Sequence, residues 1–181
     1  MQRLMTYDAS AQHWGTFLLG YRWNIYGTFT YAKPIGQVGA EATMKQFAER
    51  YEKALKSPVS WFGALEHRVS GAGMSGIPFH WHLLAASERP GMASVAEALW
   101  RDRFGMAQVG HYDPAQNGAY YVAKLASRPD GVFLFGNLDR LPYHGPDDLI
   151  SAAHANEYVP AELADKISGR YLRVKAVDEC R

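Results

Sequence analysis

The chain has a single cysteine among its 181 residues, Cys180, at the penultimate position. One thiol can form neither an intrachain disulfide nor a cysteine-based zinc site, so a reducing interior is the natural compartment. No run of 18 apolar residues occurs, which excludes a typical membrane-spanning helix, and residues 1–6 lack the apolar core of a signal peptide. We therefore expect a cytoplasmic protein with no membrane partner.

Neither sign of charge is in clear excess. The chain has 19 Lys and Arg residues and 18 Asp and Glu residues, which gives a net charge of +1. Proteins that bind nucleic acid usually carry a marked basic excess. The composition therefore gives only weak support to such a partner, although it leaves room for a local basic groove. With 48% apolar and 20% charged residues, the chain reads as one soluble globular domain.

Two kinds of pattern divide the chain into elements. Segments rich in aromatic and β-branched residues favour strands, and apolar residues three and four apart favour helices. We expect strands at 23–31, 59–69, 77–86, 106–112 and 132–135, and helices at 41–55, 92–104 and 113–127. Residues 1–20 form an irregular arm or a short helix.

The order of these elements matches a split-βαβ arrangement. We predict an α+β, ferredoxin-like fold with an antiparallel sheet of about five strands. The helices are expected mainly on one face, which leaves the other face of the sheet free for a ligand.

Two histidines stand two residues apart in the expected strand 77–86. His80 and His82 share one face of that strand, because strand side chains alternate. A glycine-rich connection joins the strand to its predecessor, 59–69, so Glu66 can lie beside the pair. Two imidazoles and a carboxylate with open positions suit a divalent ion that also holds a substrate oxygen, either Mg²⁺ or the more nitrogen-tolerant Mn²⁺. A pair of half-exposed structural histidines is the alternative interpretation.

A polar sector runs along the expected helix 113–127. At about 100° per residue, it contains Asn117, Tyr121, Lys124 and Arg128. We therefore expect Tyr121 to point away from the core, beside the two basic residues. A nearby ammonium favours the phenolate and offsets charge on a phosphate, so this tyrosine is a candidate nucleophile.

Tyr120 lies at the border of the same sector, one turn before Lys124. Helical geometry prefers Tyr121 only modestly, so Tyr120 is the alternative nucleophile. A surface Tyr–Lys pair that merely covers apolar area is the remaining interpretation.

In their order and spacing, these motifs resemble those of the rolling-circle replication initiators of the HUH endonuclease superfamily, named for a His–hydrophobic–His motif. In this chain, Tyr-Gly-Thr-Phe-Thr-Tyr at 26–31 resembles the first-strand motif of that superfamily. The HUH motif is Phe-His-Trp-His-Leu-Leu at 79–84, and the tyrosine motif is Ala-Tyr-Tyr-Val-Ala-Lys at 119–124. The position at which some members carry a second tyrosine is Leu125 here, so the chain resembles the single-tyrosine enzymes.

By this resemblance, His80 and His82 bind the divalent ion and Glu66 takes the third, acidic ligand position. Tyr121 attacks a phosphate of single-stranded DNA to leave a 5′-phosphotyrosine and a free 3′-OH, while Lys124 orients the phosphate. The implied function is a sequence- or structure-specific endonuclease. It nicks and rejoins one DNA strand to initiate rolling-circle replication of a plasmid or phage.

The resemblance covers about 23–136, which makes 1–141 the expected endonuclease domain and 142–181 a C-terminal extension of unknown role. The implied substrate is single-stranded or hairpin origin DNA, with Arg68, Asn117 and Arg128 as candidate DNA contacts. No phosphate-binding Gly-x-x-x-x-Gly-Lys loop occurs in the sequence. Unwinding is therefore expected to come from a separate host helicase.

Other functions stay open. One is a single-tyrosine transposase with the same motifs, which would act as a dimer on hairpin ends. Another is a non-catalytic nucleic-acid-binding module, in which Phe29, Tyr31 and Trp61 serve as base-stacking platforms. A third is a structural zinc site, for which the sequence offers no convincing fourth ligand.

Overall fold

The computed structural model describes residues 9–66 and 79–145. In chain order, the helices and strands are α1 (Ala9–Leu19), β1 (Ile25–Tyr31), α2 (Gln37–Leu55), β2 (Ser60–Glu66), β3 (His80–Ala86), α3 (Met92–Arg103), β4 (Gly105–His111), α4 (Gly118–Ala126) and β5 (Val132–Gly136). Two short 3₁₀ turns, Pro114–Gln116 and Leu138–Arg140, lie before α4 and after β5. None of the helices in the described ranges has the length and hydropathy that a membrane crossing requires.

One antiparallel sheet holds these five strands in the order β4-β1-β3-β2-β5. The first four strands, with α2 and α3 as the crossovers, form the split-βαβ unit, and β5 extends the sheet beside β2. The prediction of an α+β, ferredoxin-like fold with about five antiparallel strands is thus confirmed. The proposed boundary after residue 141 stays a prediction.

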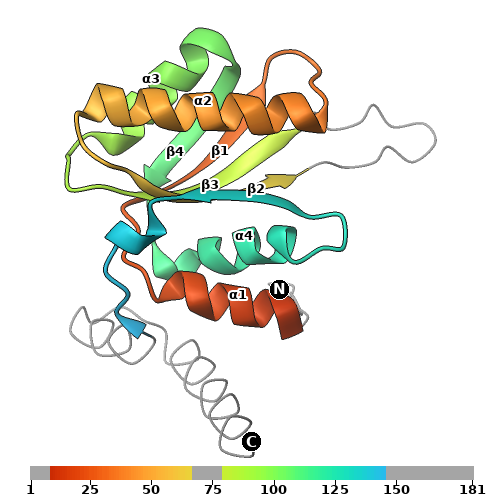
Figure 1. The fold of residues 1–181 in the computed structure, drawn as a ribbon, viewed down its shortest axis with the longest axis vertical. Coiled ribbons are helices and arrows are strands. Elements are labelled where there is room, and N and C mark those ends of the chain that lie inside the picture. Colours follow the sequence, from red (N-terminus) through yellow and green to blue (C-terminus); the bar gives the residue numbers. More distant parts are fainter. Residues whose placement is uncertain (1–8, 67–78, 146–181) are drawn as a thin grey trace, which may run out of the picture.

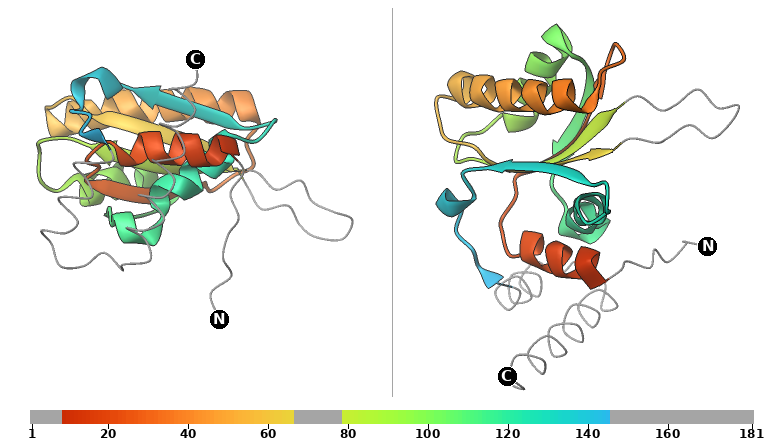
Figure 2. Two further views of the ribbon diagram at one scale, coloured as in Figure 1. Left: turned by 90° about the horizontal axis from the view of Figure 1, so that it is seen from below. Right: turned by 45° about the vertical axis from the view of Figure 1, so that its right-hand side comes forward.

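Strand alternation gives the sheet two different faces. On the first face, large apolar side chains such as Phe29, Trp81 and Leu83 pack beneath α2 and α3. The second face carries Phe62, Leu84 and the polar residues of the candidate site. Figures 1 and 2 show α2 and α3 on one side of the sheet, with α4 and then α1 on the other.

Helices therefore cover both faces, and the expectation that they lie mainly on one face is wrong in this respect. The reason is the composition of α4, which is buried on nearly all sides through residues such as Ala119, Val122 and Leu125. A helix that is apolar all round needs cover on both sides. The sheet covers one side of α4, and α1 covers the other.

Part of the second face is nevertheless open. On the edge strand β4, Met106, Gln108 and Gly110 are exposed on this face, and they align with Thr30, Thr28 and Tyr26 of β1. The expected free face of the sheet is thus reduced to a strip along β1 and β4.

The predicted single helix over 113–127 is divided in two. Its start is as expected, because the Asp113 side chain accepts a hydrogen bond from the Ala115 amide at 2.9 Å and Pro114 follows it. The first turn is 3₁₀ and ends at Asn117, whose φ of 58° is left-handed. The α-helix restarts at Gly118, where a Cβ atom would lie 3.3 Å from the ring of Tyr26. This break sets the direction from which α4 presents Tyr121 to the sheet.

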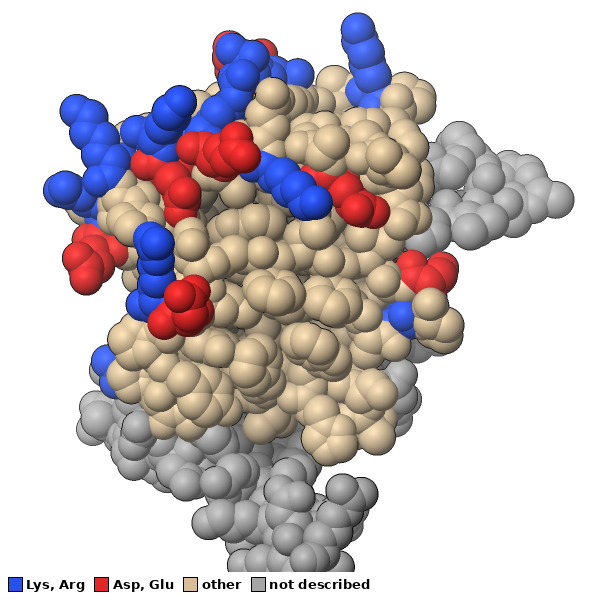
Figure 3. Space-filling model, in the orientation of Figure 1, with Lys and Arg blue, Asp and Glu red and all other residues tan. Residues whose placement is uncertain are grey.

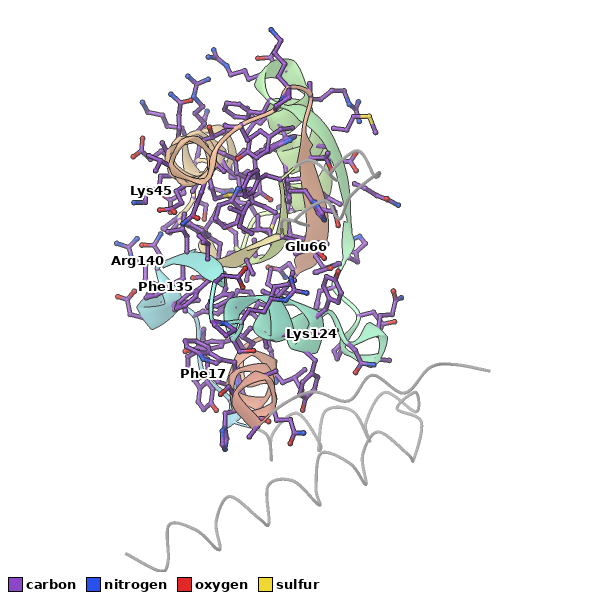
Figure 4. All side chains as sticks on the ribbon, turned by 90° about the vertical axis from the view of Figure 1, so that its right-hand side faces the viewer. Phe17, Lys45, Glu66, Lys124, Phe135 and Arg140 are labelled. Carbon is purple, nitrogen blue, oxygen red and sulfur yellow. The ribbon has the colours of Figure 1, made fainter. Side chains whose placement is uncertain are left out.

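Charged side chains of both signs gather over the α2 part of the face shown in Figure 3, while the described surface below it is almost uncharged. Two of the exposed large apolar side chains, Phe17 and Phe135, lie on the side of the molecule away from Glu66 and Lys124 (Figure 4). The surroundings of Glu66 and Lys124 are therefore distinct from that apolar surface.

Candidate metal centre

Sheet register brings three potential metal ligands together on the second face. Glu66 of β2 pairs with His80 of β3, and His82 lies two residues further along the same strand. The Oε2 atom of Glu66 is 3.2 Å from Nε2 of His80 and 3.1 Å from Nε2 of His82. One ligand atom from each residue falls within 4.8 Å of the others. The group could therefore hold a metal ion.

Burial and donor chemistry fit such an ion. Glu66 is 5% exposed and His82 is 6% exposed, whereas His80 is only half-buried. An ionised carboxylate is rarely buried unless it is paired or binds a cation. Within residues 9–66 and 79–145, the ion-pair partners found for Glu66 are these two histidines, with no Lys or Arg among them. One carboxylate and two imidazoles with an open side form a divalent-cation donor set.

The protonation states also suit metal binding, which needs a carboxylate and neutral imidazoles. Burial, aided by the charge of His80, lowers the pKa of His82 to about 4, although Glu66 opposes this shift. Burial raises the pKa of Glu66, but the hydrogen bond from Tyr121 and the two imidazoles together bring it below its ordinary value. Near neutral pH, His82 is therefore neutral and donates a hydrogen bond from Nε2 to an ionised Glu66.

We expect the free energy of unfolding of chelator-treated protein to fall as the pH drops from about 6.5 to 4. The ordinary pKa of histidine is 6.5 and that of His82 is about 4, so between these values the unfolded chain binds a proton that the folded protein does not. Stability from this group is complete above pH 6.5 and is lost progressively as the pH falls from 6.5 to about 4, by about 3 kcal/mol in all. The lowered pKa of Glu66 adds to the loss at the acid end.

Urea titrations at several pH values would measure this dependence. His82→Gln should flatten the slope between pH 6.5 and 4, whereas the matched change at an exposed histidine, His111→Gln, should leave it as in the wild type. An equal slope in wild type and His82→Gln would contradict the assignment.

Tyr121 projects from α4 onto the same triad. Its Oη donates a 2.8 Å hydrogen bond to Oε2 of Glu66, and its ring meets the ring of His82 edge-on, with 4.8 Å between centroids. The expectation that Tyr121 points away from the core is thus wrong. Because α4 lies between the sheet and α1, its sector with Tyr121 faces the sheet. Burial and the Glu66 carboxylate raise the pKa of Tyr121, so it is an uncharged phenol here.

Tyr120 occupies the opposite side of the helix. It is 4% exposed and belongs to the apolar cluster formed with α1. A Cβ atom at Gly15 of α1 would collide with its ring, which shows how closely the two helices approach. Of the two tyrosines, Tyr121 is the one with a hydrogen bond to the triad.

Three other candidate residues, Lys124, Arg128 and Asn117, lie on α4 or next to its ends. Lys124 is half-buried one helical turn after Tyr121, and Arg128 is exposed just beyond the end of α4. The charge of Arg128 partly offsets the raised pKa of Tyr121. Asn117 is exposed at the left-handed start of α4, and Arg68 lies outside the described residues. Figure 4 shows Glu66 at the sheet and Lys124 on α4 beneath it.

Sequence reasoning did not assign a role to two hydroxyl groups of β1. The Oη of Tyr26 lies 2.9 Å from Nδ1 of His82, and Thr28 Oγ1 lies 3.3 Å from the same atom. Thr28 pairs directly with His82 in the sheet. Alternation along 26–31 places both hydroxyls on one face, and this signal could have connected the first-strand motif with the histidines.

The residues suggested as base-stacking platforms are not available for that role. Phe29, Tyr31 and Trp61 are buried on the first face, beneath α2 and α3. Stacking on a nucleic-acid base needs an accessible ring. A non-catalytic binding module would therefore have to use other side chains.

No protein-family model, curated protein or solved structure matches the chain. The resemblance to replication initiators therefore rests on the motifs. The geometry by itself defines a coarser class, a candidate metal-binding triad with an adjoining tyrosine on a ferredoxin-like sheet.

Proposed function

We propose that the protein is a divalent-metal-dependent, single-tyrosine DNA endonuclease of the HUH type that nicks and rejoins one strand. In a rolling-circle replicon of a plasmid or phage, it would act at single-stranded or hairpin origin DNA, with a separate host helicase for unwinding. The observation that carries the proposal is the 2.8 Å hydrogen bond from Tyr121 to Glu66, the residue that also contacts both histidines. It joins the potential nucleophile to the metal-binding group.

Glu66, His80 and His82 would hold the ion, and their two imidazole ligands favour Mn²⁺ over Mg²⁺. A bound divalent cation would supply positive charge next to the Glu66 carboxylate and to a phosphate oxygen of the DNA. Without such charge, burial and, after it, the Glu66 carboxylate oppose ionisation of Tyr121 and raise its pKa. We therefore expect the reaction to depend strictly on a divalent ion.

The reaction exchanges one phosphate ester for another. Oη of Tyr121 bonds to the scissile phosphorus while the bond from phosphorus to O3′ breaks in line. The phenol proton leaves along its hydrogen bond to Glu66 and passes to solvent, and O3′ takes up a proton from water. Lys124 offsets negative charge on the phosphate during the exchange. The new phosphotyrosine bond conserves the energy of the broken phosphodiester bond. The 3′-OH can therefore attack it and rejoin the strand without ATP.

The open strip along β1 and β4 supports a single-stranded substrate. It adjoins the triad, because Thr30 pairs with His80 on one side and with Met106 on the other. A site on a sheet face next to a helix cannot reach a phosphate within a regular duplex. An unpaired strand can lie flat on such a surface, and polar and apolar side chains then contact its backbone and bases.

The decisive experiment mixes the protein with single-stranded DNA, both a random pool and the sequence flanking its own gene, in Mn²⁺ or in EDTA. Oligonucleotides labelled at the 3′ end should yield a labelled protein band on a denaturing gel, in Mn²⁺ only. Those labelled at the 5′ end should yield a free fragment that a polymerase can extend.

Adducts with the 5′-labelled strand instead would reverse the proposed polarity. Binding without any adduct, under all metals tried, would replace the endonuclease with the non-catalytic module. Adducts confined to hairpin ends and to a dimeric form of the protein would favour the transposase.

A further inference from the structure

We propose that Tyr26 is a positioning residue. Its hydroxyl holds Nδ1 of His82 and so fixes the ring with Nε2 directed at the metal, and Thr28 makes a weaker second contact with Nδ1. The inference rests on the proposed metal site and adds to it a specific outer partner. It assigns a function to the first-strand motif, which the reaction itself does not use.

Geometry places Tyr26 for this role. Its Oη is 2.9 Å from Nδ1 of His82, and the two rings lie nearly parallel, at 17° with 6.2 Å between centroids. The Nε2 atom of the same imidazole lies 3.1 Å from Glu66. Both nitrogens are thus held, and the plane of the ring is fixed between β1 on one side and β2 on the other.

A hydroxyl group is the right partner because the nitrogens of His82 must exchange roles. Near neutral pH, Nε2 donates to Glu66, so Nδ1 accepts from Tyr26. A histidine that gives its Nε2 lone pair to a metal carries its proton on Nδ1, which must then donate. The phenol oxygen of Tyr26 can donate in the first state and accept in the second, since a hydroxyl has both capacities. A fixed donor or acceptor would suit only one of them.

The surroundings hold Tyr26 in place. Its backbone is paired on both sides, with Leu84 of β3 and Gly110 of β4. The start of α4 closes over its ring, because a methyl group added at Gly118 would lie only 3.3 Å from the Tyr26 Cδ2 atom. The ring therefore has little freedom to turn, and its hydroxyl stays directed at His82.

The test replaces Tyr26 with phenylalanine, which keeps the ring and removes the hydroxyl. Partners of this kind typically contribute a factor of about 10 to 100 in metal affinity, so Mn²⁺ binding should weaken by about that factor. Thr28→Val, which removes the longer contact, should weaken binding less. A matched control is Tyr112→Phe, because the buried Tyr112 hydroxyl makes no hydrogen bond to Glu66 or His82 within the described part of the chain; its Mn²⁺ affinity should equal that of the wild type.

A spectroscopic readout separates positioning from a general loss of structure. In ¹⁵N-histidine protein treated with chelator, the Nδ1 resonance of His82 should shift in Tyr26→Phe and stay unchanged in Tyr112→Phe. With the diamagnetic ion Zn²⁺, the wild type should show a proton on Nδ1 that exchanges slowly with water, and Tyr26→Phe should lose that protection.

Equal Mn²⁺ affinity of wild type and Tyr26→Phe, with an unmoved Nδ1 resonance, would overturn this inference and leave the proposed function intact. Failure of the wild type to bind Mn²⁺ or Zn²⁺ would overturn the metal site, and with it both proposals. If Tyr26→Phe does not fold, Thr28→Val decides through the same two measurements, because its contact reaches the same nitrogen.

Discussion

Tyr121→Phe is expected to abolish the covalent adduct with DNA, by at least about a thousandfold, because no other described hydroxyl lies against Glu66 in its place. The substitution removes one oxygen and keeps the ring packed on His82. Mn²⁺ binding should persist, because the phenol donates a hydrogen bond to the triad and is not itself a ligand of the metal ion. Adduct formation on a denaturing gel and Mn²⁺ affinity measured on the same preparation check both parts.

Tyr120→Phe is the matched control. Its ring packs against α1, so the adduct should form at close to the wild-type rate. Loss of the adduct in Tyr120→Phe, together with its survival in Tyr121→Phe, would keep the class of enzyme and move the nucleophile by one residue.

Glu66→Gln is expected to weaken Mn²⁺ binding by at least about a hundredfold and to remove nicking with it. The amide matches the carboxylate in shape but lacks the charge that attracts a divalent ion and that both imidazoles contact. Calorimetry or electron paramagnetic resonance with Mn²⁺ would measure the loss. The exposed Glu49 of α2 provides the control, because Glu49→Gln makes the same change on the far side of the sheet and should bind Mn²⁺ normally.

A Glu66→Gln protein that still binds Mn²⁺ tightly would mean that the ion uses other ligands. The adduct assay would then show whether catalysis follows that ion. His80→Ala offers an independent check, because it removes a ligand without touching the hydrogen bond to Tyr121.

Strand alternation was sufficient to predict the triad. Glu66, His80 and His82 depend on only one long-range fact, the pairing of two strands that are adjacent in the chain, and the period of two fixes which side chains share a face. The place of β1 in the sheet depends on more than such a local pattern. It pairs with β3 and β4, which lie far from it in the chain, so its position follows only from the whole split-βαβ arrangement.

The direction of α4 could not be predicted in this way. A helical wheel assumes one buried side, and on that assumption the polar sector with Tyr121 belongs to solvent. The chain instead covers α4 from outside with α1, whose segment 9–19 carries no clear amphipathic stripe. Only the packing of two elements about a hundred residues apart reveals that the buried side of α4 includes Tyr121. The contact of Tyr26 with His82 likewise depends on the register between β1 and β3, which the pattern of either strand alone does not give.

The position of α1 also fixes how short a fragment that keeps this fold can be. The motifs span 26 to 124, and a fragment cut to residues 23–136 would keep every one of them. That fragment would lose α1 and expose to water the side of α4 that carries Tyr120. Such a surface favours aggregation and would loosen the helix that carries Tyr121. The smallest autonomous unit therefore starts no later than Ala9, so residues outside the motifs are as necessary to the fold as those within them.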